Sequence, residues 1–250
     1  MRFSDKVAMV TGAGQGIGAH YARALAAEGA AVVVAEINEE LGEATAQSIR
    51  DAGGQAISVR TDVASEESAQ AAAAAAVDAF GGIDFLVNNA AIYANMVRAP
   101  WMEVDLEYYR RFMSVNMDGV LVMCRAVYPA MLARGGGAIV NQSSTAAWSL
   151  AGFYGLAKLG VNGFTVSLAK ELGPKNIRVN GISPGPTDTE ATRASVSADT
   201  MATLLKTMPL SRMGSTQDIV NTCLFLLSDE AAWITGQTWC VDGGAVLRPA

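Results

Sequence analysis

The sequence predicts an α/β fold: a doubly wound parallel sheet of about seven strands with helices on both faces, in a single domain spanning residues 1–250. Two observations predict this class. Short apolar runs alternate with longer stretches of helical periodicity, which favours right-handed βαβ units. The apolar runs are largely continuous, as expected for strands covered by helices on both faces.

The seven strands are expected in short runs that are apolar throughout. They are residues 7–10, 31–35, 56–59, 85–88, 138–141, 178–182 and 238–241. Six longer stretches are expected to be helices, at residues 16–28, 39–52, 66–80, 106–132, 154–172 and 217–227. Residues 186–213 are rich in Thr, Ser and Ala and weakly periodic. They are expected to form a lid over a site, the alternative being a surface excursion without function.

Residues 11–18 connect the first expected strand to the first helix and read Thr-Gly-Ala-Gly-Gln-Gly-Ile-Gly. Without a Cβ, glycine lets the backbone turn tightly and approach a phosphate closely. The start of the following helix supplies N–H donors and a positive dipole end. In this context the segment predicts a Rossmann-type site for a dinucleotide pyrophosphate.

Glu36 stands at the end of the second expected strand, where a carboxylate can accept hydrogen bonds from the adenosine ribose. Its charge would repel a 2′-phosphate, and neither Gln15 nor Ile37 supplies a compensating cation. The sequence therefore predicts NAD(H) over NADP(H). The alternative is an ordinary acidic residue near a helix start, a role that Glu39 and Glu40 could fill equally well.

Tyr154 and Lys158 are four residues apart in an expected helix, so they share one face, a single turn apart. A nearby ammonium favours the phenolate and lowers the pKa of the phenol, whereas burial raises it. The hydroxyl of Ser144 could hold a substrate oxygen against that phenol. Together these groups can move a proton on or off an alcohol.

The composition excludes several other classes of function. The net charge of −6 gives no electrostatic footprint for nucleic acid. There is no apolar run of ~18 residues to span a membrane and no apolar signal-peptide core, so a cytoplasmic protein is expected. Three cysteines show neither a disulfide framework nor metal-ligand spacing, and no metal site is expected. A single histidine, His20, makes a Ser-His-Asp triad improbable.

The motifs described above occur in the order seen in short-chain dehydrogenases/reductases. That order also includes Asn-Asn-Ala at residues 88–90, Asn116, and Pro184-Gly185 with Thr189. From residue 6 to residue 244 the chain resembles this family. The resemblance implies one domain, a nicotinamide cofactor, a small-molecule alcohol or ketone substrate and a homotetramer.

The same resemblance implies the catalytic residues. Tyr154 is the general acid/base, and Lys158 assists it while binding the nicotinamide ribose. Ser144 orients the substrate oxygen, although Ser143 remains possible. Asn116 holds a water that links Lys158 to solvent as a proton relay.

Cofactor contacts are implied along the whole chain. The expected residues are Gly12, Gln15, Gly16, Ile17, Gly18, Glu36, Asp62, Val63, Asn89, Ala90, Tyr154, Lys158, Pro184, Gly185, Thr187 and Thr189, with Asn88 beside them. Two departures from the family pattern occur. Ala91 replaces the usual glycine, with little expected consequence, and the loop between Ser144 and Tyr154 is shorter than is common, which should reshape one wall of the substrate pocket.

The resulting hypothesis is an NAD-dependent oxidoreductase that interconverts a secondary alcohol and a ketone. The residues expected around the substrate are apolar, which suggests an apolar substrate, with cyclic compounds among the candidates. They are Ile92, Tyr93, Met96, Trp148, Leu150, Phe153, Met201, Leu204 and Leu205. One alternative is an NADP-dependent 3-oxoacyl-thioester reductase, against which Glu36 and the net acidity speak. Another is a catalytically retired dinucleotide-binding module, but all four catalytic residue types are present.

Overall fold

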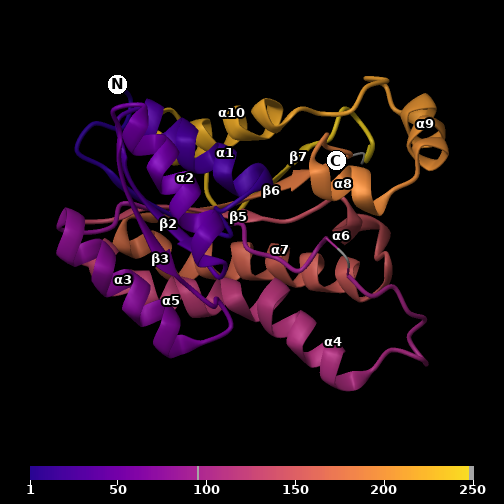
Figure 1. Ribbon diagram of the computed structural model, residues 1–250, viewed down its shortest axis with the longest axis horizontal. Helices are drawn as coiled ribbons and strands as arrows, with labels where there is room; N and C mark the ends of the chain where they lie inside the picture. Colours follow the sequence, from indigo (N-terminus) through magenta and orange to yellow (C-terminus); the bar gives the residue numbers. More distant parts are fainter. Residues whose placement is uncertain (95, 248–250) are drawn as a thin grey trace.

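The computed structural model describes residues 1–94 and 96–247, and its centre is a parallel sheet of seven strands (Figure 1). The strands are β1 (Val7–Thr11), β2 (Ala31–Glu36), β3 (Gln55–Arg60), β4 (Phe85–Asn88), β5 (Gly137–Gln142), β6 (Ile177–Pro184) and β7 (Thr238–Val241). Their order is β3-β2-β1-β4-β5-β6-β7, and every neighbouring pair is parallel. The predicted fold class is confirmed.

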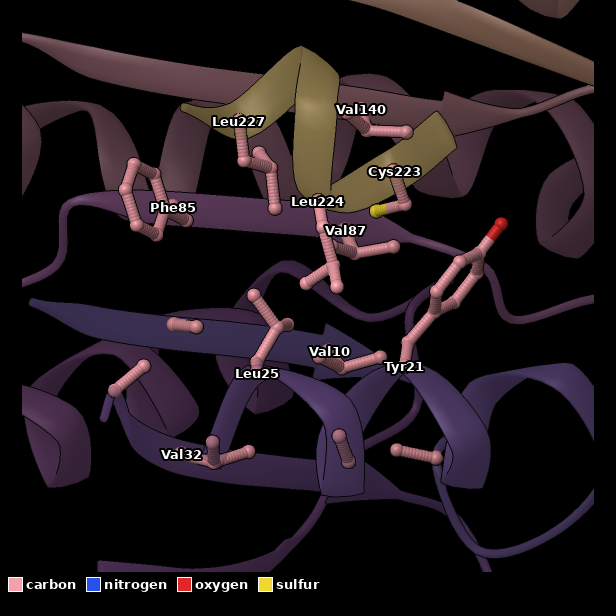
Figure 2. Close-up of a cluster of buried hydrophobic side chains, with 14 of the residues drawn as sticks. Val10, Tyr21, Leu25, Val32, Phe85, Val87, Val140, Cys223, Leu224 and Leu227 are labelled. Carbon is pink, nitrogen blue, oxygen red and sulfur yellow. The ribbon is translucent and has the colours of Figure 1, made fainter. Parts of the chain in front are cut away.

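Helices cover both faces of the sheet, and each face has its own apolar core. On one side lie α1 (Gly16–Ala27), α2 (Glu39–Asp51) and α10 (Thr216–Leu227), and on the other α3 (Glu66–Phe80), α5 (Gly119–Ala133) and α7 (Gly152–Leu172) (Figure 1). Figure 2 shows the first core, where Leu25 of α1 and Leu224 of α10 pack over Val10 and Val87 of the strands. Within the described part of the chain, no helix is both long and apolar enough to cross a membrane.

The remaining helical segments are short. They are α4 (Leu106–Met113), a π-helical turn (Ser114–Asp118), α6 (Ala146–Ser149), α8 (Glu190–Ser195), α9 (Ala198–Thr207) and two 3₁₀ turns (Gly173–Lys175 and Asp229–Ala231). The single helix expected over residues 106–132 is therefore wrong in one respect, because the π-helical turn interrupts it. Residues 186–213, the expected lid, contain the two short helices α8 and α9, which Thr189 and Ser197 cap at their N-termini.

The sheet changes its direction of growth between β1 and β4. The chain builds outward from β1 through β2 to β3, then returns to place β4 on the other side of β1. The loops after these two strands therefore diverge, and a crevice opens at their carboxyl ends. This edge of the sheet carries the site described next.

Candidate active site

A cleft of about 1500 Å³ lies at the carboxyl ends of the strands. Ligand pockets for a single small molecule usually hold about 300–1,000 Å³, so this cleft has room for a cofactor and a substrate together. It brings together most of the residues that the sequence singles out. Those lining it are Gly12, Gln15, Gly16, Ile17, Gly18, Glu36, Asp62, Val63, Asn89, Ala90, Ser144, Tyr154, Lys158, Pro184, Gly185, Thr187 and Thr189.

The glycine-rich turn has the shape of a phosphate cradle. Gly12 has a φ of +61°, and a Cβ there would lie 2.7 Å from Cα of Ala90. At Gly16, where α1 begins, a Cβ would meet no atom within 4 Å, which leaves open space in front of the helix. No side chain caps α1, and its first turn carries no acidic residue. The uncapped N–H groups and the positive helix end fit a pyrophosphate.

Asn89, the residue that follows β4, holds this turn in place with its side chain. Its Nδ2 donates to the carbonyl oxygens of Thr11 and Gly12, each at 3.0 Å. In return, Thr11 Oγ1 accepts from the backbone N–H groups of Asn89 and Ala90. The amide of Asn89 is therefore used within the protein, and it acts on the cleft by holding the turn in place. Asn88 is buried and bonds Asn141 of β5 at 2.9 Å.

Glu36 is only 9% exposed, and its carboxylate accepts three backbone hydrogen bonds. The donors are the N–H groups of Gly14 at 2.9 Å, Ile37 at 2.9 Å and Asn38 at 3.1 Å. A carboxylate has about four acceptor sites, so this arrangement leaves about one for a ligand hydroxyl. The negative charge is thus fixed at the rim of the cleft by the backbone itself.

At the next strand end, Asp62 is held at both of its carboxylate oxygens. Oδ1 accepts from the N–H of Ala64 at 3.0 Å, and Oδ2 accepts from Nη2 of Arg111 at 3.0 Å. Arg111 lies on α4 and lines the cleft, yet nothing in its sequence neighbourhood pointed to this role. Only the packing of α4 near the third strand end brings the two residues together.

Tyr154 and Lys158 project into the cleft from successive turns of α7. The ammonium Nζ lies 5.9 Å from the centroid of the Tyr154 ring, and it donates a hydrogen bond to the Gln142 carbonyl at 2.9 Å. Lys158 is 3% exposed, and burial lowers its pKa from 10.5 to about 8. The salt bridges among the described residues do not include it. An ammonium with donors to spare at a cleft wall fits the hydroxyls of a ribose.

Burial dominates the proton affinity of Tyr154. It raises the pKa of the phenol well above its usual 10, the Ser144 hydroxyl acts in the opposite direction, and Tyr93 adds to the rise. The net direction is thus opposite to that expected from Lys158 alone. The cost of removing the phenolate from water outweighs the hydrogen bond from Ser144 that favours the phenolate.

The two neighbouring serines face different surroundings. Ser143 is 3% exposed, and its hydroxyl donates to the carbonyl of Lys158 at 3.2 Å. Ser144 lines the cleft, where its Oγ accepts from the N–H of Ala146 at 3.1 Å and acts on Tyr154. Both serines line the cleft, but the Ser143 hydroxyl is bonded within the protein, whereas that of Ser144 lies beside the phenol.

The short loop after Ser144 folds tightly onto the start of α7. It forms α6 and then places Leu150 in the left-handed region, with φ of 48°. Gly155, the residue after Tyr154, makes room for it, because a Cβ there would lie 2.6 Å from the carbonyl oxygen of Ala146. The loop that the sequence marks as shortened is therefore packed against the helix that carries the phenol.

Asn116 lies in the π-helical turn, is not among the residues that line the cleft, and has its side chain bonded to Ile92. Oδ1 accepts from the N–H of Ile92 at 2.6 Å, and Nδ2 donates to the carbonyl of Ile92 at 3.0 Å. Asn116 is 1% exposed. Its side chain thus clamps the segment after β4.

Two expected cofactor contacts, Thr187 and Thr189, line the cleft but use their hydroxyls locally. Thr187 Oγ1 donates to the carbonyl of Gly185 at 3.0 Å. Thr189 Oγ1 accepts from the N–H of Thr192 at 3.1 Å and caps α8. Both hydroxyls would have to exchange these bonds, or accept further ones, in order to contact a cofactor.

The substrate end of the cleft has largely apolar walls. Six of the residues expected there line it, namely Ile92, Tyr93, Met96, Phe153, Met201 and Leu204. The expectation is wrong for Trp148, Leu150 and Leu205, which are not among the lining residues. Their directions in the short loop and on α9 could not be read from apolar composition alone. Among the described residues, no group of His, Cys, Asp and Glu is arranged to hold a metal ion.

The chain is similar to known proteins over nearly its whole length. A sequence model for a family described as enoyl-(acyl carrier protein) reductase matches residues 12–246. An uncharacterized oxidoreductase of Mycobacterium tuberculosis (strain H37Rv) is 60% identical over 246 residues, which cover 98% of this chain and 99% of that protein. The trans-4-hydroxycyclohexanecarboxylate dehydrogenase of Sinomonas cyclohexanicum is 40% identical over 257 residues, which cover 97% and 93%. A solved 7α-hydroxysteroid dehydrogenase complexed with NADH and 7-oxo glycochenodeoxycholic acid matches with a TM-score of 0.91 and 35% identity, covering 97% and 95%.

Proposed function

The chain belongs to the short-chain dehydrogenase/reductase family of oxidoreductases acting on CH–OH groups, and we propose that it is an NAD-dependent dehydrogenase of apolar secondary alcohols. The observation that carries the proposal is the meeting of Ser144, Tyr154 and Lys158 on one wall of a cleft that also contains a phosphate cradle. The bound nicotinamide would accept the hydride in oxidation and supply it in reduction.

In the oxidation direction, Tyr154 takes the proton of the substrate hydroxyl. Ser144 holds the same oxygen and fixes the distance to the phenol. Because burial raises the pKa of Tyr154, the phenolate needs positive charge nearby. Lys158 provides one such charge and donates its remaining N–H groups to the nicotinamide ribose.

The proton must then leave a buried site. The side chain of Asn116 is occupied by Ile92, so we assign the relay to its main-chain carbonyl. The π-helical turn supports this role, because a wider turn disturbs the regular carbonyl pairing of a helix and such turns are frequent at functional sites. A water bound there could pass the proton from Lys158 to solvent.

A preference for NAD over NADP is proposed from the rim of the cleft. Glu36 places a fixed negative charge where the adenosine ribose would lie. The cation paired across the β2–β3 register is Arg60, but it is exposed and bonded to Glu39 at 3.4 Å. A 2′-phosphate would therefore meet a carboxylate held by three N–H groups and a cation already paired elsewhere.

For the substrate, we propose an apolar, cyclic secondary alcohol. The largely apolar walls support this, as does the cyclohexane ring in the name of the Sinomonas relative's substrate. The test is a panel of cyclic and acyclic secondary alcohols offered with NAD⁺ and with NADP⁺, followed by the absorbance of the reduced cofactor. Turnover of cyclic alcohols with NAD⁺ is the expected result.

The rival, a reductase of 3-oxoacyl thioesters that uses NADPH, is tested in the same panel. This rival is supported by the description of the matching family, which names an acyl-carrier-protein substrate. Reduction of an acetoacetyl thioester with NADPH, together with no turnover of alcohols with NAD⁺, would replace the proposal by the rival. Failure to bind either dinucleotide would remove both.

A homo-oligomer is proposed from the outer face of α7. Leu156, Leu159 and Val166 are exposed there, and a Cβ at Gly163 would meet no atom within 4 Å. These spacings place the four residues on one side of the helix. An exposed apolar stripe of this kind marks a contact between copies, and a tetramer is the family expectation. Light scattering of Val166→Glu should show smaller particles, and Val77→Glu, on an exposed position of α3, is the control.

A further inference from the structure

The segment after β4 is irregular, yet one point of it is fixed. Both backbone polar groups of Ile92 are hydrogen-bonded by the side chain of Asn116, at 2.6 and 3.0 Å. Asn116 is 1% exposed, so this pair of hydrogen bonds lies in the protein interior. The backbone of the next residue, Tyr93, is therefore held in place at Ile92 even though Tyr93 lies in a loop.

From this anchor the ring of Tyr93 reaches the ring of Tyr154. Their centroids are 5.6 Å apart at an interplanar angle of 49°. A second ring, that of Phe112, meets Tyr154 at 6.4 Å and 75°. Both separations fall within the range of favourable aromatic pairs, about 4.5–7 Å. The phenol of Tyr154 is thus oriented by two rings from two other elements, of which Phe112 is buried and Tyr93 lines the cleft.

Tyr93 combines a place in the cleft wall with a hydroxyl that no described protein group uses. Within the described chain it makes no hydrogen bond, whereas the hydroxyl of Tyr108 accepts from the N–H of Val97 at 2.9 Å and that of Tyr21 donates to Gln142 at 2.7 Å. A tyrosine hydroxyl that is partly buried usually has a partner. Because Tyr93 lines the cleft, its hydroxyl is available to water or to a ligand there.

We propose that Tyr93 is a positioning residue for Tyr154: its ring holds the phenol in the orientation that meets the substrate, and its hydroxyl faces the substrate space. This assignment rests on the proposed dehydrogenase function. The chain of contacts runs from Asn116 through Ile92 to Tyr93 and ends on the general acid/base. The Asn116–Ile92 hydrogen bonds therefore contribute, through Tyr93, to the orientation of the Tyr154 phenol.

Electrostatics support the geometry. Tyr93 contributes to the raised pKa of Tyr154, whereas Ser144 opposes that rise. The groups that meet Tyr154 are Lys158 from its own helix, Ser144 from the loop after β5, Tyr93 from the loop after β4 and the uncharged Phe112 of α4. Removing the hydroxyl of Tyr93 alone should therefore lower the pKa of Tyr154 without moving its ring.

The experiment compares Tyr93→Phe, which keeps the ring, with Tyr93→Leu, which removes it, and uses Tyr128→Phe on α5 as a control. In oxidation of cyclohexanol with NAD⁺, Tyr93→Leu should lower kcat about 3- to 10-fold, the equivalent of one aromatic pair. Tyr93→Phe should keep kcat within about twofold, but the acid limb of its kcat/KM profile should move to lower pH. The dissociation constant of NADH should stay within about twofold in all three variants.

A second readout does not need turnover. The phenolate absorbance of Tyr154, isolated by subtracting the same titration in a Tyr154→Phe background, should appear at lower pH in Tyr93→Phe than in the wild type. If neither the titration nor kcat changes in Tyr93→Phe and Tyr93→Leu, the role of Tyr93 is overturned. A parallel loss of NADH binding would also overturn it, because it would indicate general damage. A wild type that oxidises no alcohol would refute the proposed dehydrogenase, while the titration would still decide the role of Tyr93.

Discussion

The carboxylate of Glu36 accepts a hydrogen bond from the backbone N–H of Gly14 at 2.9 Å, so the end of β2 and the glycine-rich turn are joined directly. Two further N–H groups hold the same carboxylate. The residue proposed to select the cofactor is thus also part of the turn that would hold its phosphates. A substitution that removes the charge but keeps one of the two oxygens tests the role of the charge.

Glu36→Gln removes the charge and keeps one oxygen, which can still accept from Ile37 and Asn38, while the amide nitrogen cannot accept from Gly14. We expect the ratio of kcat/KM with NADP⁺ to that with NAD⁺ to rise about 10- to 100-fold. This is less than the ~4 kcal/mol of two unit charges 4 Å apart at an effective dielectric near 20, because water and salt screen the pair. Steady-state kinetics with both cofactors measure the ratio. Glu40→Gln, at an exposed position of α2 with no ion pair among the described residues, is the control, and an unchanged ratio in Glu36→Gln would refute the assignment.

Tyr154→Phe removes the proposed general acid/base while keeping the ring between Tyr93 and Phe112. We expect kcat to fall by about 10²–10⁴ because proton transfer loses its acceptor. The dissociation constant of NADH, measured by fluorescence titration, should change little. Near-normal turnover in this variant would mean that another group moves the proton.

The buried Lys158 gives a pH dependence of stability with a definite sign. Its pKa is about 8 in the folded protein against an ordinary value of 10.5 for a solvated lysine, a difference that corresponds to about 3 kcal/mol. Below about pH 8 the amine is charged in both the folded and the unfolded state, so the full cost of burying it is present. Between about pH 8 and 10.5 the folded protein releases its proton first, so this cost is progressively removed.

We therefore expect the free energy of unfolding of Lys158→Met, relative to that of the wild type, to be highest below about pH 8. The stability difference between the two should shift toward the wild type by up to about 3 kcal/mol as the pH rises to 10.5. Urea unfolding across this range measures it, and Lys175→Met, at an exposed position, controls for the loss of a lysine. A difference that stays flat with pH would show that burial does not act on this amine.

Two glycines of α7 should respond to alanine in opposite ways. At Gly155 a Cβ would lie 2.6 Å from the Ala146 carbonyl oxygen and 2.7 Å from the Leu150 carbonyl carbon, whereas at Gly163 it would meet nothing within 4 Å. In the Val166→Glu background, where the proposed contact between copies is broken, Gly163→Ala should raise the free energy of unfolding by up to about 1 kcal/mol through helix propensity. Gly155→Ala should lower it by about 1–3 kcal/mol and reduce kcat, because the loop must shift beside Tyr154. Equal effects in urea unfolding would contradict the packing of the short loop.

Local pattern was enough to predict the strands, because a buried parallel strand needs only a short apolar run. The first was expected at residues 7–10 and forms Val7–Thr11, and the fourth was expected at 85–88 and forms Phe85–Asn88. The π-helical turn at Ser114–Asp118 was not predicted, since apolar periodicity runs through it without a break. The helices after Thr189 were missed although a signal was present: Thr189 and Ser197 are favourable N-caps.

The sequence by itself determined the order of strands and helices, the glycine turn between β1 and α1, and the placement of Tyr154 and Lys158 one helical turn apart. Each depends on residues that are neighbours along the chain, so spacing alone encodes it. Tertiary structure decided that the Ser143 hydroxyl bonds the Lys158 carbonyl while Ser144 lies beside Tyr154, that Asn116 clamps Ile92, and that Tyr93 meets Tyr154. These contacts join residues from separate elements, and the direction of each side chain is fixed only when the elements pack.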